Sequence, residues 1–101
     1  MAKLSFKSAN GTSFHDTILH CTYNQLVEAI GEPQFADNSG DDKVNFDWIC
    51  ELEDGRVFTI YDWKEYRPIK PNEPIAWHIG GTSKIITHQA LIEMTALLAK
   101  Q

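Results

Sequence analysis

Apolar and polar residues alternate most regularly in the middle of the chain. From Val44 to Leu52 every second residue is apolar, which is the period of a β-strand with one buried face. The dipeptide Asp54-Gly55 follows, and it is typical of a two-residue type I′ hairpin turn. Residues 56–63 then return as the partner strand. The pattern therefore predicts a central antiparallel hairpin.

A two-residue turn also predicts which side chains share a face. It places Trp48 opposite Tyr61 and Asp47 opposite Asp62. One face then carries Val44, Phe46, Trp48, Leu52, Val57, Tyr61 and Trp63. The other carries Ile49, Phe58 and Ile60 with Glu51. Because both faces are apolar, the second face needs a cover, either the helices or another copy of the chain, and we expect a homo-oligomer.

The rest of the chain predicts further strands and two helices. Short strands are expected at residues 3–8, 12–19 and 75–79. Thr22 and Gln25 have the spacing of a capping box, and Gly31 marks the end of the helix that they begin. A last helix is expected from about residue 87 to residue 100. We therefore predict one α+β domain over residues 1–101, with a small antiparallel sheet and two helices.

Composition restricts the class of protein. The chain has 101 residues, of which 43% are hydrophobic, so it can form one domain with a core. Its net charge of −5 disfavours binding to duplex nucleic acid. We see no signal peptide and no membrane span, so we expect a cytoplasmic protein that does not bind a membrane. Cys21 and Cys50 are then expected to be reduced and buried.

The segment from Tyr61 to Lys84 differs from the rest of the chain in charge. It has four Lys and Arg against three Asp and Glu, whereas the remainder has five against eleven. Arg67 suits bidentate binding of phosphate, and the Gly-Gly-Thr-Ser run after a predicted strand suits an anion-binding nest. Three of its aromatic residues, Trp63, Tyr66 and Trp77, offer flat faces to nucleobases.

These features together predict a site for a small ligand that contains phosphate. The candidate ligand-binding residues are Trp63, Lys64, Tyr66, Arg67, Trp77, His78, Gly80, Gly81, Thr82, Ser83 and Lys84. Each feature also has an ordinary alternative: the glycines as a turn, the tryptophans as core, and the lysines as solvated surface charges. No cofactor is expected.

The sequence offers little that points to catalysis. His15, His20 and Cys21 have a spacing that matches no structural zinc site, so we expect no metal. Opposed carboxylates such as Asp47 and Asp62 could share a proton, bind a cation or contact nearby basic side chains. No nucleophile has an identifiable base, so we expect no catalytic residues and no enzyme.

Three stretches carry a resemblance to a known family. "EAIGEP", "FDWICELEDGRVFTIYDWKEYRP" and "WHIGGTSK" are similar to a widespread group of small tailed-phage proteins in which IYDWK and WHIGG recur. The resemblance covers about residues 22–98, and the group includes the anti-CBASS sponge proteins, which sequester cyclic oligonucleotide signals such as cyclic GMP-AMP. It implies no catalysis, a homo-oligomer (a tetramer) and a ligand held between subunits. It also implies the cytoplasm of an infected bacterium as the place of action.

Our first hypothesis is accordingly a phage immune-evasion protein that binds a cyclic di- or trinucleotide without cleaving it. The alternative is an acidic inhibitor that binds a host defence or nucleic-acid enzyme through Asp37, Asp41, Asp42, Glu51, Glu53 and Asp54. A third hypothesis is a nucleotide-cleaving enzyme that uses Asp47, Asp62 and His78.

Overall fold

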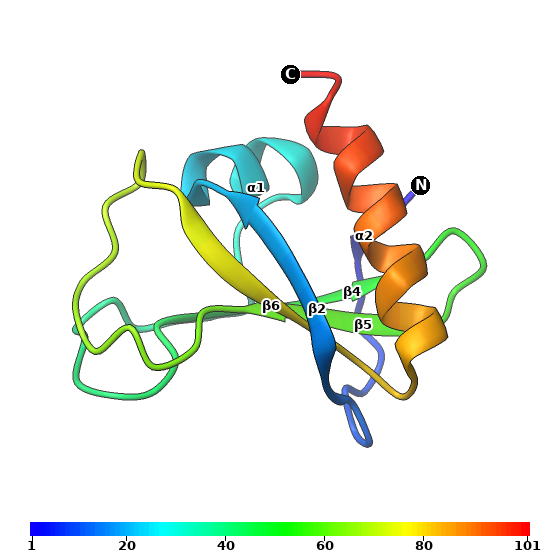
Figure 1. Ribbon diagram of the computed structural model, residues 1–101, viewed down its shortest axis with the longest axis horizontal. Coiled ribbons are helices and arrows are strands. Elements are labelled where there is room, and N and C mark those ends of the chain that lie inside the picture. Colours follow the sequence, from blue (N-terminus) through cyan, green and yellow to red (C-terminus); the bar gives the residue numbers. More distant parts are fainter.

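Six antiparallel strands and two helices make up the fold of the computed structural model, which describes residues 1–101 (Figure 1). The elements are β1 (Lys3–Leu4), β2 (Ser13–Cys21), α1 (Tyr23–Ile30), β3 (Phe35–Ala36), β4 (Phe46–Glu51), β5 (Val57–Tyr61), β6 (Ile75–Gly81) and α2 (Lys84–Leu98). The predicted α+β class, with an antiparallel sheet and two helices, is confirmed. Neither helix has the length and apolar character needed to cross a membrane.

The helix ends follow from their capping residues. At α1, Thr22 and Gln25 form the predicted capping box, and Gly31 ends the helix with a φ of +98°. The other helix, α2, begins about one turn earlier than predicted. The reason is Ser83, whose Oγ accepts a hydrogen bond from the backbone N–H of Ile86 and so caps the helix.

The strands differ from the prediction mainly in their ends. The first strand keeps only Lys3–Leu4, whereas β6 continues past residue 79 to include Gly80 and Gly81. A short strand, β3, forms where the sequence analysis predicted no strand. The strand order is β1-β4-β5-β6-β2. The remaining strand, β3, also pairs with β4. Two long loops remain, a β3–β4 loop at residues 37–45 and a β5–β6 loop at residues 62–74.

Both helices lie on one face of the sheet, which we call the core face (Figure 1). Helix α2 packs against β2, β5 and β6, and α1 packs against α2. At the centre of the core, Trp48 of β4 and Trp77 of β6 meet edge to face, with ring centroids 5.3 Å apart. Leu26 of α1 and Met94 of α2 cover them, and all four side chains are fully buried. The opposite face of the sheet, which no helix covers, is called the open face.

The register of the central hairpin differs from the prediction by one residue. Trp48 pairs with Ile60, and Asp47 pairs with Tyr61. The turn contains three residues, because Leu52 and Arg56 are joined by a backbone hydrogen bond and only Gly55 has a positive φ, +89°. This is the three-residue hairpin loop with glycine in the left-handed region, which replaces the predicted type I′ turn.

A slip of one residue moves every side chain of the returning strand to the opposite face. Phe58 and Ile60 therefore lie on the core face with Trp48 and are fully buried within one chain. The second face is therefore not the one that was predicted, because Phe58 and Ile60 do not lie on it and need no cover from another chain. The stated reason for expecting a homo-oligomer is thus wrong. The cysteines are as expected, since Cys21 and Cys50 are buried and form no disulfide.

Candidate functional site

A row of side chains crosses five strands on the open face. The pairings place Phe35, Asp47, Tyr61, His78 and Ile18 side by side on β3, β4, β5, β6 and β2. Directly paired residues of antiparallel strands point to the same face, so the row is continuous. None of the five side chains is buried. One carboxyl group thus lies in a partly exposed strip of apolar and aromatic side chains.

Four rings gather on this face, and we call them the aromatic cluster: Phe14, Tyr61, Trp63 and His78. The rings of Phe14 and His78 are stacked, with centroids 4.0 Å apart. Trp63 follows Tyr61 at the end of β5, and its ring lies 6.2 Å from that of Tyr61 and 6.3 Å from that of His78. Burial lowers the pKa of His78, which favours its neutral ring. The cluster offers flat rings that remain partly open to solvent.

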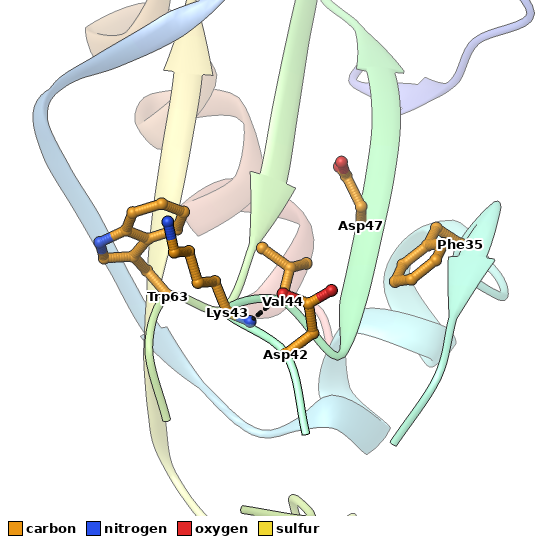
Figure 2. A pocket seen from close by; sticks show the side chains of 6 residues that line it. All are labelled: Phe35, Asp42, Lys43, Val44, Asp47 and Trp63. Atoms are coloured by element: carbon orange, nitrogen blue, oxygen red, sulfur yellow. Dashed lines mark hydrogen bonds between the residues drawn. The ribbon is translucent and has the colours of Figure 1, made fainter. Parts of the chain in front are cut away.

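A pocket of about 390 Å³ opens beside the cluster. Its lining residues are Phe35, Asp42, Lys43, Val44, Asp47 and Trp63. Figure 2 shows Trp63 and Phe35 on opposite sides, with Val44 and Asp47 between them. The volume lies within the range of about 300 to 1,000 Å³ that is common for small-molecule sites. The pocket is therefore large enough for a small ligand.

Hydrogen bonds between the two long loops hold the pocket together. The N–H of Lys64 donates to the carbonyl oxygen of Lys43 at 2.7 Å. The side chain of Asn38 exchanges two hydrogen bonds with the backbone of Ile69, at 2.7 and 2.9 Å. These contacts join loops that are distant in the sequence, and Figure 1 shows the loops lying beside one another. Lys43 and Trp63 are positioned by this junction.

Two cations lie over the ring of Trp63. The Nζ atoms of Lys64 and Lys43 are 5.6 and 5.9 Å from its centroid, within the range of cation–π interactions. Lys64 adopts a left-handed φ of +55°, which is unfavourable for a residue with a side chain. Its backbone bond to Lys43 helps to hold that conformation. Two positive charges thus lie beside Trp63 at the edge of the pocket.

Asp47 is the unusual polar group of the pocket. Its Oδ1 atom is buried and has no hydrogen-bond partner. Burial, and then the negative charge of Asp62, raise the pKa of Asp47 to about 6. The predicted direct opposition of the two carboxylates is wrong. Asp62 is buried on the core side, where it accepts hydrogen bonds from the backbone N–H groups of Asn45 and Phe46.

The raised pKa of Asp47 predicts a dependence of stability on pH. The folded state holds this proton more tightly than the unfolded chain, whose Asp pKa is about 3.9, so stability falls as pH rises from about 4 to about 6. We expect Asp47→Asn to be more stable than the wild type by about 1 to 2 kcal/mol above pH 7, a value discounted for the partial exposure of the group. Near pH 4 the difference should vanish. Urea unfolding at both pH values measures it, and an equal difference at the two values would contradict the assignment.

Several candidates from the sequence have roles in the fold instead. Trp77 is fully buried and donates its indole N–H to the carbonyl oxygen of Cys21, so no base can stack on it. Gly80 and Gly81 belong to β6 and form no anion-binding nest. A Cβ on Gly80 would lie 2.5 Å from the Oγ1 atom of Thr59, so close packing explains this glycine. Ser83 is the N-cap of α2.

The remaining candidates do not line the pocket. Arg67 is paired with Glu73 and Glu65, which neutralise its guanidinium locally. Tyr66 is exposed on the β5–β6 loop but lies outside the aromatic cluster. Thr82 and Lys84 are exposed at the start of α2, which follows β6. Of the residues predicted from the sequence, only Trp63, Lys64 and His78 come together.

The side chains that were considered as zinc ligands or as catalytic groups do not converge in the structure. His20 and Cys21 are consecutive on β2, and Cys21 is buried whereas His20 is exposed. No three side chains of His, Cys, Asp or Glu come together as potential metal ligands. The nucleotide-cleaving hypothesis needed Asp62 beside Asp47, yet the Asp62 carboxylate already accepts hydrogen bonds from backbone N–H groups.

The acidic side chains proposed for an inhibitor do not form one surface. Asp37, Asp41 and Asp42 lie on the β3–β4 loop, before β4 begins. Glu53 and Asp54 lie in the turn after β4 ends, and Asp54 is paired with Arg56. A six-residue strand spans about 20 Å, so the two groups are well separated.

Half of the residues that line the pocket were not predicted as functional from the sequence. Val44 was predicted on a face of the hairpin, Phe35 and Lys43 lay outside the predicted helices and strands, and nothing in their spacing marks a site. A three-residue turn in the predicted hairpin would have placed Asp47 beside Tyr61 and shown the row. Comparison of the chain with family models, curated proteins and solved structures finds no match. We therefore infer a function from the open face itself.

Proposed function

We propose that the protein binds a cyclic oligonucleotide on the open face and holds it without cleaving it. One base enters the pocket between Trp63 and Phe35, and the phosphates lie near Lys43 and Lys64. The observation that carries the proposal is the combination of two aromatic side chains that line one pocket with two cations close to one of them. Nucleotides present these two features together, a flat ring and a nearby phosphate.

The aromatic cluster extends this site along the sheet. His78 and Phe14 continue from Trp63 across β6 and β2, and their stacked rings offer a second apolar surface. A cyclic dinucleotide or trinucleotide has more than one base, so a second base can lie along this surface. The ligand is therefore expected to lie along the row and not only in the pocket.

Binding without cleavage is supported by the state of the nearby carboxylates. Acid–base cleavage of a phosphodiester needs groups that exchange protons at the reacting atoms. Asp62 and Asp42, the other carboxylate of the pocket, already accept hydrogen bonds from backbone N–H groups, and the neighbours of Asp47 in the row carry no carboxyl group. The resemblance to phage sponge proteins supplies the setting, in which a signal such as cyclic GMP-AMP is sequestered in an infected bacterium.

Self-association remains part of this proposal, with a different surface from the one first expected. Ile85 and Ile92 lie one heptad apart on α2, and 74% and 62% of their surfaces are exposed. Exposed isoleucines at this spacing suit contact with a second helix. A homo-oligomer, including the tetramer that the resemblance implies, would then use α2 and leave the open face free for the ligand.

Calorimetry with cyclic di- and trinucleotides tests the proposal. We expect the wild type to bind at least one ligand of the panel and to release it intact on heating. Trp63 is 41% exposed, so Trp63→Ala should retain the fold and bind about 5- to 100-fold more weakly, the effect of losing one stacked base.

The matched control is Phe6→Ala, which removes a fully exposed aromatic ring near the N-terminus. This variant should bind as the wild type does. The proposal fails if the wild type binds nothing in the panel, if the ligand is returned cleaved, or if Trp63→Ala and Phe6→Ala bind equally well.

A further inference from the structure

Asp47 is the acidic side chain of the pocket whose charge no protein group stabilises. Its Oδ1 atom is buried without a hydrogen-bond donor, and no basic side chain forms an ion pair with it. Asp42, the other carboxylate that lines the pocket, accepts a hydrogen bond from the backbone N–H of Lys43 at 2.7 Å. A carboxylate that is partly removed from water and gains no partner is disfavoured relative to its neutral acid. Of the two forms of Asp47, the neutral acid therefore suits this position better.

We infer that the ligand binds together with one proton from solvent, which Asp47 takes up as its carboxylate becomes a carboxylic acid. This inference rests on the proposed function and describes how pH regulates it. Asp47 lines the pocket and is half-buried, so water reaches part of it from the pocket (Figure 2). A ligand displaces that water, and the phosphates of a nucleotide bring further negative charge. Both effects favour the neutral form of Asp47, and neither requires the ligand to touch the Oδ1 atom.

The strands that pack beside Asp47 add no positive charge. From β5, Tyr61 is paired with it, and Asp62 adds negative charge from the core side. Strand β3 contributes no ionisable group. Burial raises the pKa of Cys50 on β4 and that of Tyr61, so both side chains are neutral near pH 7. No group on these strands competes with Asp47 for a proton between pH 6.5 and pH 8.

The positive groups of the site are placed at Trp63 and not at Asp47. The Nζ atoms of Lys43 and Lys64 lie 5.9 and 5.6 Å from the centroid of the Trp63 ring. His78 lies two strands from Asp47 in the row, and burial lowers its pKa from the ordinary value of 6.5. The ring of His78 is therefore mainly neutral from pH 6.5 upward. A dependence of affinity on pH above this value is assigned to Asp47.

Calorimetry at two pH values tests the inference. The probe is whichever of cyclic GMP-AMP, cyclic di-AMP and cyclic triadenylate binds most tightly at pH 6.5. The unbound protein loses the Asp47 proton above a pKa of about 6, whereas the complex retains it, so affinity falls as pH rises, by at most about 10-fold per pH unit for one proton. We expect the wild type to bind about 10-fold more weakly at pH 8 than at pH 6.5. The phosphodiesters of the probe keep their charge over this range.

The proton itself can be counted. Titrations at pH 7.5 in PIPES and in Tris, whose ionisation enthalpies differ, report the number of protons that are taken up on binding. We expect about 0.5 to 1 proton per bound ligand for the wild type. The observed binding enthalpies should therefore differ between the two buffers.

Asp47→Asn keeps the shape of the side chain and carries no charge at any pH. This variant should take up no proton and bind equally well at pH 6.5 and pH 8. At pH 8 it should bind about 10-fold more tightly than the wild type. The matched control is Asp41→Asn, which removes an exposed carboxylate outside the pocket lining. Asp41→Asn and His78→Gln should both retain the wild-type dependence on pH, and melting temperature reports whether each variant is folded.

The outcomes distinguish this inference from the proposed function. If the wild type binds the probe equally well at pH 6.5 and pH 8 without proton uptake, the inference is wrong while cyclic nucleotide binding stands. The role of Asp47 is also overturned if Asp47→Asn keeps the wild-type dependence on pH, or if His78→Gln abolishes it. If none of the three probes binds at either pH, the proposed function fails and the inference fails with it.

Discussion

Asp62→Ala is expected to lower the free energy of unfolding by about 2 to 5 kcal/mol. The Asp62 side chain is 1% exposed and accepts hydrogen bonds from the backbone N–H of Asn45, at 2.9 and 3.0 Å, and of Phe46, at 2.8 Å. Alanine would leave two buried donors without an acceptor, each at a cost of about 1 to 3 kcal/mol. Urea unfolding measures the change.

The matched control for this variant is Asp41→Ala. Asp41 lies on the same β3–β4 loop but its side chain is exposed and holds no hydrogen bond that positions the sheet. Its replacement should change stability by less than about 0.5 kcal/mol. Equal effects of the two substitutions would show that the carboxylate of Asp62 does not hold the start of β4. The experiment therefore tests the role of Asp62 as a buried structural anchor, in place of the paired catalytic role that the sequence suggested.

The strands of the central hairpin are evident from the sequence, whereas its turn is not. Alternation of apolar residues identified the first strand, and the turn that follows it identified the antiparallel partner strand. The dipeptide Asp54-Gly55 fits a two-residue turn and equally fits the last two positions of a three-residue turn. Only the backbone of Asp54 distinguishes them, and its φ is not positive. The sequence did contain an argument against the two-residue turn, because that turn leaves apolar residues on both faces of the hairpin.

The candidate site was partly predictable for a related reason. Trp63 and Lys64 are adjacent in a segment that is rich in basic and aromatic residues, so the composition of that segment was enough to identify both. The other side of the pocket comes from β3 and the β3–β4 loop, which reach Trp63 only through the hydrogen bonds between the loops. Gly80 and Gly81 were misassigned because the sequence does not distinguish a glycine required for close packing from a glycine required for a turn.

The junction of the two loops leads to the last prediction. Gly40 has a φ of +82°, and a Cβ at this residue would lie 2.6 Å from the backbone Cα and C atoms of Arg67. Real Cβ atoms do not approach so closely, so in Gly40→Ala the β3–β4 loop must move away from the β5–β6 loop. That movement separates Lys43 from Trp63. We expect a loss of about 2 to 4 kcal/mol in unfolding free energy, from the left-handed φ and the overlap together.

Gly11→Ala is a closely matched control, since Gly11 has the same φ of +82° and its added Cβ would meet only the Cγ2 atom of Thr82, at 3.8 Å. It should lose about 1 kcal/mol, the cost of a left-handed alanine, and retain wild-type affinity for the ligand. Gly40→Ala should bind at least about 10-fold more weakly, as expected when a positioned cation is lost. Unfolding in urea and calorimetry measure the two effects. If the two alanine variants match in both stability and affinity, contact between the loops does not build the pocket. If Gly40→Ala loses stability but binds as the wild type does, the ligand does not use the side of the pocket formed by Lys43.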